Sequence, residues 1–220
     1  MHNAGVDAKG FVLAHTAVTA PPVVPELRLR LAELITPLWE ALEAWAGRAC
    51  EPPFWAFAWA GGQALARFLL DHPERVRERP VLDFGSGSGL TGIAAARAGA
   101  AHVLAADIDP LAAAACRINA QLNGVALETT GEDWIGRAVP ADWVVLAGDM
   151  LYEGPLARRA LPWLTRCAGA GATVLLGEPG RNYAPGGGFV ELARYGVPTT
   201  VELEGRTSRE ARVLLLAPEG

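Results

Sequence analysis

The sequence predicts an α/β fold in which a doubly wound, mostly parallel sheet ends on an antiparallel last strand and follows an N-terminal helical extension. From Pro80 onward, short apolar runs alternate with helical patterns, which is typical of βαβ units and a parallel sheet. The last two predicted strands, 199–203 and 211–217, are separated by only seven residues. No crossover helix fits in that space, so these two strands are expected to run antiparallel.

The N-terminal residues carry two patterns. Residues 1–25 are mixed and end in prolines, so we expect a loosely held arm there. Residues 26–47 have apolar side chains at spacings of three and four, which predicts an amphipathic helix. Pro37 lies inside that pattern and is expected to kink or split the helix. Residues 1–50 are therefore predicted to be an arm and helix, and 51–220 to be the main domain.

An aromatic segment follows, in which Trp55, Phe57 and Trp59 alternate as on one face of a short strand or in a core clamp. Gly61 and Gly62 then open a helix that is expected to run from Gln63 to Asp71. The remaining elements before the last two strands are expected to be strands over 81–84, 103–106, 143–147 and 173–176, and helices over 90–98, 110–123 and 155–167.

Composition narrows the function. Hydrophobic residues make up 51% of the chain and charged residues 20%, which indicates a globular core rather than disorder. A net charge of −5 does not suggest a nucleic-acid partner. No apolar run is long enough to cross a membrane, and the start of the chain lacks a signal pattern. The three cysteines and four histidines show no metal spacing, so we expect a cytoplasmic protein without a metal site.

A strand, a glycine-rich turn and a helix are predicted around residues 81–90. Gly85 and Gly87 allow the backbone to turn sharply beside a ligand, and Gly89 allows the helix to start close to the strand. Asp107 ends the next predicted strand, where a carboxylate binds the ribose of a nucleoside. This combination predicts a nucleoside cofactor.

The details of the loop favour S-adenosylmethionine over a dinucleotide. The sixth position counted from Gly85 is Leu90, where a dinucleotide fingerprint has glycine. Asp83 stands two residues before the loop, where it would meet a ligand's ammonium group but repel a pyrophosphate. The predicted antiparallel last strand also differs from a dinucleotide fold.

These residues resemble the first two motifs of class I methyltransferases, which have seven β-strands in a Rossmann-like sheet. The aromatic segment through Arg67, the sequence AGDMLY over 147–152 and GEPGR over 177–181 narrow the match. Together they resemble bacterial relatives of the electron transfer flavoprotein β-subunit lysine methyltransferase, over about residues 20–217. The resemblance implies transfer of a methyl group from S-adenosylmethionine to a lysine ε-amine of a protein, with that β subunit or a ribosomal stalk protein as the target.

The resemblance also implies roles for residues, position by position. Trp59 and Gln63 would line the cofactor, and Asp107 would bind the ribose with Ile108 beside the adenine. Asp133 and Trp134 would lie at the adenine edge, with Glu132 as the alternative acid. The methionine part of the cofactor would be held by Asp83, Gly85, Ser86, Gly87 and Gly89.

The acceptor mouth would be formed by Asp149 and Tyr152, three residues apart beyond a predicted strand. Asp149 would accept a hydrogen bond from the lysine amine, although its position also suits a helix N-cap. Arg181 closes a turn that is expected to shape the acceptor pocket or to serve as a turn only. The alternatives are a small-molecule, nicotinamide-type N-methyltransferase, an NAD-dependent dehydrogenase and a catalytically silent cofactor-binding module.

Overall fold

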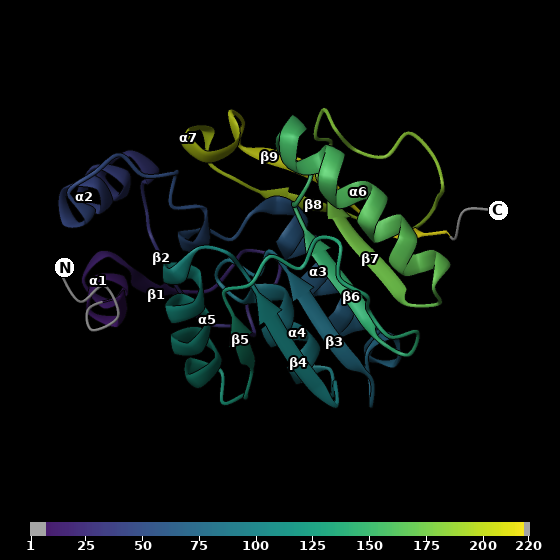
Figure 1. Ribbon diagram of the computed structural model, residues 1–220. Coiled ribbons are helices and arrows are strands. Elements are labelled where there is room, and N and C mark those ends of the chain that lie inside the picture. The colour runs from purple at the N-terminus through teal and green to yellow at the C-terminus, as the bar shows by residue number, and fades with distance from the viewer. Residues whose placement is uncertain (1–7, 218–220) are drawn as a thin grey trace.

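The computed structural model describes residues 8–217 and contains a seven-stranded sheet with the strand order β5-β4-β3-β6-β7-β9-β8 (Figure 1). The strands are β3 (Pro80–Phe84), β4 (His102–Ala106), β5 (Glu128–Thr130), β6 (Val144–Gly148), β7 (Thr173–Glu178), β8 (Phe189–Pro198) and β9 (Ser208–Leu216). Neighbouring strands from β5 to β7 are parallel, whereas β9 is antiparallel to both β7 and β8. The predicted mostly parallel sheet with an antiparallel last strand is confirmed.

Helices cover both faces of the sheet, as expected for right-handed crossovers (Figure 1). On one face lie α3 (Ala60–Asp71), α4 (Leu90–Arg97) and α5 (Pro110–Leu122), and on the other lies α6 (Gly154–Gly169). Side chains of the parallel strands alternate between the two faces: Val81 packs into the first apolar core and Leu82 into the second. Burial on both faces explains why these strands read as continuous apolar runs.

The N-terminal prediction was partly wrong. The described chain begins with α1 (Ala8–His15), then β1 (Ala17–Thr19) pairs antiparallel with β2 (Leu29–Leu31). These elements replace most of the expected loose arm, whose first seven residues lie outside the described range. The helix expected over 26–47 forms only as α2 (Ile35–Ala46).

The reason lies in how the apolar side chains are used. Leu29 and Leu31 are buried on either side of Arg30, which is the alternation of a strand. Pro37 lies in the first turn of α2, where its missing N–H costs no intrahelical hydrogen bond. The proline therefore helps to start α2 and does not split it.

The aromatic segment forms a 3-10 helix (Phe54–Ala56) and not a strand, and a second 3-10 helix (Pro73–Arg75) follows α3. Trp55 and Phe57 are buried in an apolar cluster that joins α1, α2 and the first turns of α5. Helix α3 starts at Ala60, three residues before the expected Gln63. A domain boundary at residue 50 stays a prediction.

The strand expected over 199–203 is a helix, α7 (Val201–Glu204). Thr200 caps it, because its hydroxyl oxygen accepts a hydrogen bond from the Leu203 N–H, and Gly205 ends it in the left-handed region with φ +68°. The antiparallel partner of β9 is instead β8, earlier in the chain. Within residues 8–217, no helix combines the length and the apolar character needed to cross a membrane.

Candidate active site

The glycine loop connects β3 to α4 at the carboxyl edge of the sheet. Gly85, Gly87 and Gly89 have φ values of +68°, +50° and +82°, which only glycine adopts without strain. A Cβ on Gly89 would lie 2.8 Å from the Cys116 sulfur of α5, and a Cβ on Gly85 would collide with the Met150 side chain. The loop therefore needs glycine for its conformation and for its close packing.

Asp83, in β3, fixes this loop to the helix that follows. Its carboxylate accepts hydrogen bonds from the Thr91 hydroxyl at 2.5 Å and from the Gly92 N–H at 2.9 Å. Burial raises the pKa of Asp83 to about 6, and the nearby charge of Asp107 adds to the rise. Both oxygens are thus engaged inside the protein, and contact with a ligand's ammonium group stays a prediction.

Asp107 lies directly after β4 and reaches the glycine loop. One carboxylate oxygen accepts from the Gly87 N–H at 2.8 Å and the other from the Asp109 N–H at 2.9 Å. Burial raises the pKa of Asp107 despite these hydrogen bonds. Ile108 follows with 73% of its surface exposed. The two predicted cofactor residues therefore lie side by side, at the edge of the loop.

The candidates for the adenine edge follow β5. Asp133 pairs with Arg159 of α6 at 2.5 Å, and although partial burial raises its pKa, this arginine more than compensates and lowers it. Glu132 pairs with Arg137 at 2.8 Å. Among the described residues, the buried indole N–H of Trp134 has no hydrogen-bond partner. Both acids are therefore held by arginines, which does not decide between them.

An open pocket lies over the glycine loop. Its lining is made of small and aromatic side chains, namely Phe54, Phe57, Trp59, Gly62, Gly85, Ser86, Gly87, Ser88, Leu90, Thr91 and Gly148. Trp59 was predicted here from its position before α3. Gln63 lies one residue beyond Gly62, donates to the Ala58 carbonyl at 2.6 Å and, among the described residues, leaves its buried Oε1 without a partner.

This pocket suits the methionine part of S-adenosylmethionine. A Cβ on Gly87 would make one contact, with the Trp55 Cα at 3.6 Å, so Gly87 leaves room beside the loop. The Gln63 oxygen without a partner belongs to the helix whose Gly62 lines the pocket, and an amide oxygen can accept a hydrogen bond from an ammonium group. Asp107 at the loop edge can accept from ribose hydroxyls, since each carboxylate oxygen has a second lone pair. These hydrogen-bond acceptors therefore fit the ammonium group and the ribose hydroxyls of the predicted cofactor.

Asp149 follows β6 in a backbone conformation that is rare for a residue other than glycine, with φ +63°. Its N–H donates to the Gly177 carbonyl of β7 at 2.8 Å. Its carboxylate accepts from the Arg181 Nε at 2.6 Å and from the Gly61 N–H, in the first turn of α3, at 3.0 Å. Burial raises the pKa of Asp149, and Arg181 opposes that rise.

Tyr152 lies three residues further on and is 38% exposed. Its ring packs on Phe54 of the cofactor pocket, with ring centroids 5.1 Å apart. Partial burial, together with the charges of Glu153, Asp107 and Glu51, raises the pKa of Tyr152 to about 12. The hydroxyl is therefore neutral at physiological pH and can both donate and accept a hydrogen bond.

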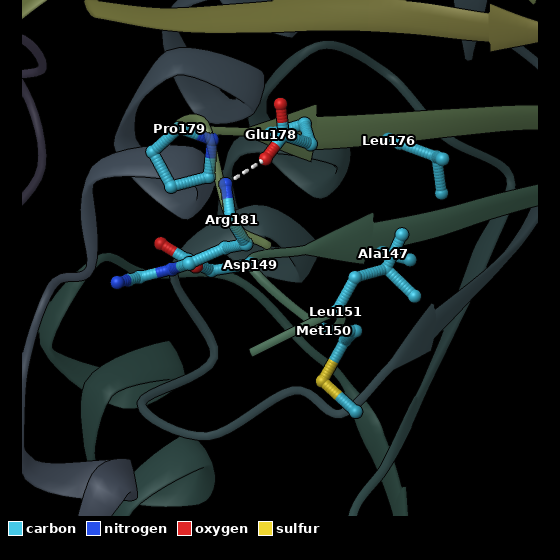
Figure 2. A pocket seen from close by; sticks show the side chains of 9 residues that line it. Ala147, Asp149, Met150, Leu151, Leu176, Glu178, Pro179 and Arg181 are labelled. Carbon is cyan, nitrogen blue, oxygen red and sulfur yellow. Dashed lines mark hydrogen bonds and ion pairs between the residues drawn. The ribbon is translucent and has the colours of Figure 1, made fainter. Parts of the chain in front are cut away.

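A second, small pocket lies beside Asp149 at the ends of β6 and β7 (Figure 2). It is lined by Ala147, Asp149, Met150, Leu151, Leu176, Gly177, Glu178, Pro179 and Arg181. Met150 borders this pocket and also lies against Gly85 of the cofactor loop. The candidate acceptor and cofactor regions thus adjoin across one flexible side chain.

Three residues of this site were not predicted from the sequence. Thr91, eight residues after Asp83, could have been found as a hydroxyl in the first turn of the helix after the loop. Met150 stood inside the motif but carried no chemical signal. Glu204, which pairs with Arg181, lies in the stretch expected to connect the last two strands, and no pattern in the sequence marks it.

Comparison with known proteins gives several relatives with substantial coverage. The electron transfer flavoprotein beta subunit lysine methyltransferase of Xenopus laevis is 44% identical over 176 residues, covering 79% of this chain and 70% of the relative. The protein of the same name from Homo sapiens is 40% identical over 190 residues, covering 80% and 67%. The model of the ribosomal protein L11 methyltransferase family, PrmA, matches residues 64–147 and so ends just before Asp149.

Solved structures share the fold at low sequence identity. Magnesium protoporphyrin IX methyltransferase from Synechocystis, solved with bound S-adenosylmethionine, is 18% identical with a TM-score of 0.50, covering 70% of this chain and 79% of that one. Wild-type Trm5b from Pyrococcus abyssi is 17% identical with a TM-score of 0.52, covering 88% and 54%. These likenesses show that the chain shares the Rossmann-like fold of these two structures.

Proposed function

The chain belongs to the family of electron transfer flavoprotein β subunit lysine methyltransferases, and on that premise we propose that its substrate is a lysine of an electron transfer flavoprotein β subunit. Membership makes it an S-adenosylmethionine-dependent methyltransferase of protein lysines. The observation that carries the substrate is the 44% identity to the Xenopus laevis relative, which extends over 79% of this chain.

The cofactor side would be built by the glycine loop and its neighbours. We propose that Gly85, Ser86, Gly87 and Gly89, with Trp59 and the free Gln63 oxygen, hold the methionine part of the cofactor. Asp107 would bind the ribose, with Ile108, Asp133 and Trp134 on the adenine side. Asp83 would act from behind the loop, since both of its oxygens are bonded to α4.

The acceptor side would be formed by Tyr152 and Asp149. The bound cofactor would supply a methyl group on a sulfonium. The lysine ammonium first loses a proton to solvent, and the neutral amine then forms the N–CH3 bond as the S–CH3 bond breaks and S-adenosylhomocysteine leaves. A free lysine has a pKa of about 10.4, so the neutral form at pH 7.4 costs about 4 kcal/mol. Tyr152 has an exposed, neutral hydroxyl that can orient the amine, and Asp149 would provide the negative charge beside it.

Most of the rate would then come from positioning, which can contribute about 7–11 kcal/mol in well-oriented reactions. The aliphatic side chains of Met150 and Leu151 keep the mouth poor in water, which disfavours the ammonium form of lysine. None of the described groups is assigned as a dedicated general base. The turnover rate is therefore expected to rise with pH as more of the lysine becomes neutral.

Methyl transfer into candidate substrates tests this proposal. The protein is incubated with labelled S-adenosylmethionine and, separately, a purified electron transfer flavoprotein β subunit, ribosomal protein L11 and free nicotinamide. We expect label on a lysine of the β subunit, located by mass spectrometry. L11, as a ribosomal stalk protein, is the second candidate because of the family-model match over residues 64–147. Turnover of nicotinamide alone would contradict a protein substrate.

A further inference from the structure

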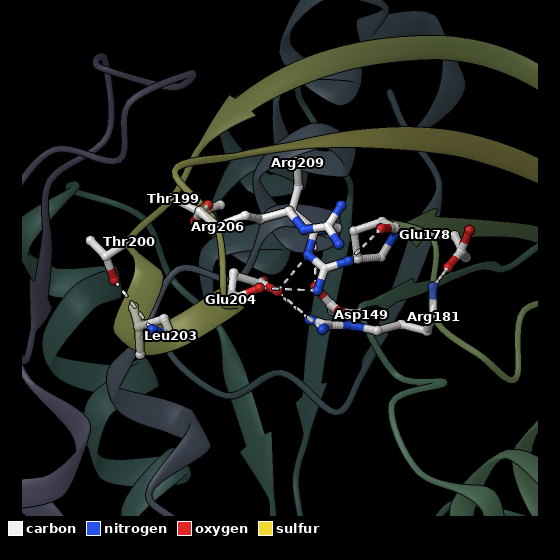
Figure 3. A network of polar contacts seen from close by, with 11 residues as sticks. Asp149, Glu178, Arg181, Thr199, Thr200, Leu203, Glu204, Arg206 and Arg209 are labelled. Carbon is white, nitrogen blue, oxygen red and sulfur yellow. Dashed lines mark hydrogen bonds and ion pairs between the residues drawn. The ribbon is translucent and has the colours of Figure 1, made fainter.

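We propose that Arg181 is a positioning residue, which holds the Asp149 side chain in one orientation at the acceptor mouth and is itself anchored by Glu204 of α7. This inference rests on the proposed function for the role of the mouth, whereas the geometry of the network does not depend on it. Figure 3 shows the three side chains together, with Glu204 between the guanidinium groups of Arg181 and Arg209.

Each part of the Arg181 side chain has its own partner. Nε donates to Asp149 at 2.6 Å, and the two terminal nitrogens donate to the two oxygens of Glu204 at 3.0 and 3.1 Å. The backbone N–H of the same residue donates to Glu178 at 2.5 Å. A guanidinium held at both ends of its planar fork has little freedom to rotate, so it fixes the carboxylate that it meets.

Glu204 is the anchor because it is buried and doubly paired. Its side chain is only 2% exposed, and it also accepts from the Arg209 Nε at 2.9 Å. The cap of Thr200 and the left-handed Gly205 fix the short helix that carries it. Arg181 therefore links the end of β7 to a helix on the C-terminal hairpin, far from the glycine loop in sequence.

Arg181 also faces the cofactor side. Its guanidinium carbon lies 6.0 Å from the ring centroid of Trp59, within the range of a cation–π contact. Asp149, the partner of Arg181, accepts a hydrogen bond from the N–H of Gly61, which lies two residues after Trp59. A single arginine thus contacts both the cofactor-lining tryptophan and the acceptor-side carboxylate.

The charges around Asp149 determine what removing the arginine would do. The groups that face it are Arg181 from the end of β7, Glu204 from α7 and the Gly61 N–H from α3. Burial raises the pKa of Asp149, Arg181 lowers it and Glu204 raises it. Without the arginine, the buried carboxylate keeps Glu204 as a neighbour and, in the part of the chain that the structure describes, has no ion-pair partner, so it will take up a proton at a higher pH.

The first experiment compares Arg181→Met with Arg181→Lys and with wild type across pH 6–9, as the ratio of variant to wild-type turnover. The titration of the lysine substrate cancels in this ratio. For Arg181→Met we expect a ratio at least tenfold below one at pH 6 that climbs with pH, and for Arg181→Lys a smaller loss with a flatter ratio. Arg212→Met is the matched control, since it removes another arginine, paired with buried Glu178 at 2.7 Å, that does not touch Asp149. The proposal would be overturned if the turnover ratio of Arg212→Met followed the same pH profile as that of Arg181→Met. It would also be overturned if the ratio for Arg181→Met did not change with pH.

A second readout is independent of catalysis. The pKa of Asp149 is measured by NMR of aspartate labelled at the carboxyl carbon, with the signal assigned by its loss in Asp149→Asn. We expect the pKa to rise in Arg181→Met and to fall in Glu204→Gln, which removes the opposing charge while keeping the shape. An unchanged pKa in both variants would contradict the role of Arg181. If the pKa moves as expected but no protein lysine is methylated, the proposed function fails and the network stands.

Discussion

Two buried aspartates, Asp83 beneath the cofactor loop and Asp149 at the acceptor mouth, are satisfied in different ways. Asp83 takes hydrogen bonds from residues 8 and 9 positions away and, within residues 8–217, has no arginine partner. Asp149 is bonded to residues 32 and 88 positions away, one of which is an arginine. The support beneath the glycine loop is therefore built by a short stretch of chain, whereas the surroundings of Asp149 are assembled from distant segments, with an ion pair to Arg181.

The largest expected effect is on cofactor affinity, from a substitution in the glycine loop. In Gly87→Val, a β-branched side chain would be forced to φ +50° and would project into the pocket over the loop. We expect S-adenosylmethionine to bind at least about 1,000-fold more weakly, equivalent to about 4 kcal/mol. Calorimetry of the folded variant checks this. Gly186→Val, at a glycine with open space around it, is the control and should bind normally.

The next effect is on stability, at the junction of the two regions. A Cβ on Gly61 would collide with the backbone carbonyl of Gly177, which cannot move aside without shifting β7. Gly61→Ala is expected to lower the free energy of unfolding by about 3 kcal/mol. A Cβ on its neighbour Gly62 would meet the Leu90 side chain at 3.9 Å, which is an ordinary contact. Gly62→Ala should therefore leave the free energy of unfolding unchanged or raise it slightly. Equal urea-unfolding midpoints for the two variants would contradict the close packing.

Removal of a single carboxylate from the cofactor side has a smaller effect. Asp107→Ala should weaken S-adenosylmethionine binding by about 10–100-fold, because hydrogen bonds to a charged group contribute about 1.5–3 kcal/mol. The variant also frees the Gly87 N–H, which Asp107 now accepts from at 2.8 Å. Unchanged affinity in a folded Asp107→Ala, measured by calorimetry, would remove the ribose assignment.

The burial of Asp83 predicts a dependence of stability on pH. Its pKa is raised from 3.8 to about 6 in the folded protein, so between those values the folded state binds more protons than the unfolded state. The contribution of Asp83 to stability is therefore greatest below about pH 4 and falls as the pH rises to 6, by up to about 1.4 kcal/mol per pH unit. Urea unfolding at pH 4, 5 and 6 should show that Asp83→Asn lacks this component. A slope equal to that of wild type would contradict the raised pKa.

The contrast between the regions also explains what could be predicted from the sequence. The parallel strands and the glycine loop could be predicted because their signals, apolar runs and closely spaced glycines, lie within a few consecutive residues. The sequence predicts a helix where β2 forms, since Leu27 and Leu31 also fit a spacing of four. The sequence predicts the strand before β9 at 199–203, whereas the structure has it at β8, because the partly exposed residues of β8 carry no strong apolar alternation.

The same limit applies to the site. Asp149 and Tyr152 were predicted as a motif, but the motif says nothing of what faces it. The bond from Arg181 to Asp149 and the anchor at Glu204 depend on β7 and α7 meeting in space. No spacing in the chain encodes that meeting, whereas the pairing of Asp83 with Thr91 follows from a strand, a turn and a helix in sequence.

The central claim is that cofactor and acceptor sites adjoin but use different residues, and Asp149→Asn tests it most directly. The variant keeps the shape but loses the charge, so we predict a loss of at least about tenfold in turnover, or about 1.4 kcal/mol. The affinity for S-adenosylmethionine should change by less than about threefold, as a residue outside the cofactor pocket requires. Turnover is measured with the protein that accepts the methyl group, and the affinity for S-adenosylmethionine is measured by calorimetry on the same enzyme preparation. Wild-type turnover would clear Asp149 of a role in the acceptor site, and a collapse in cofactor affinity would assign it to the cofactor site.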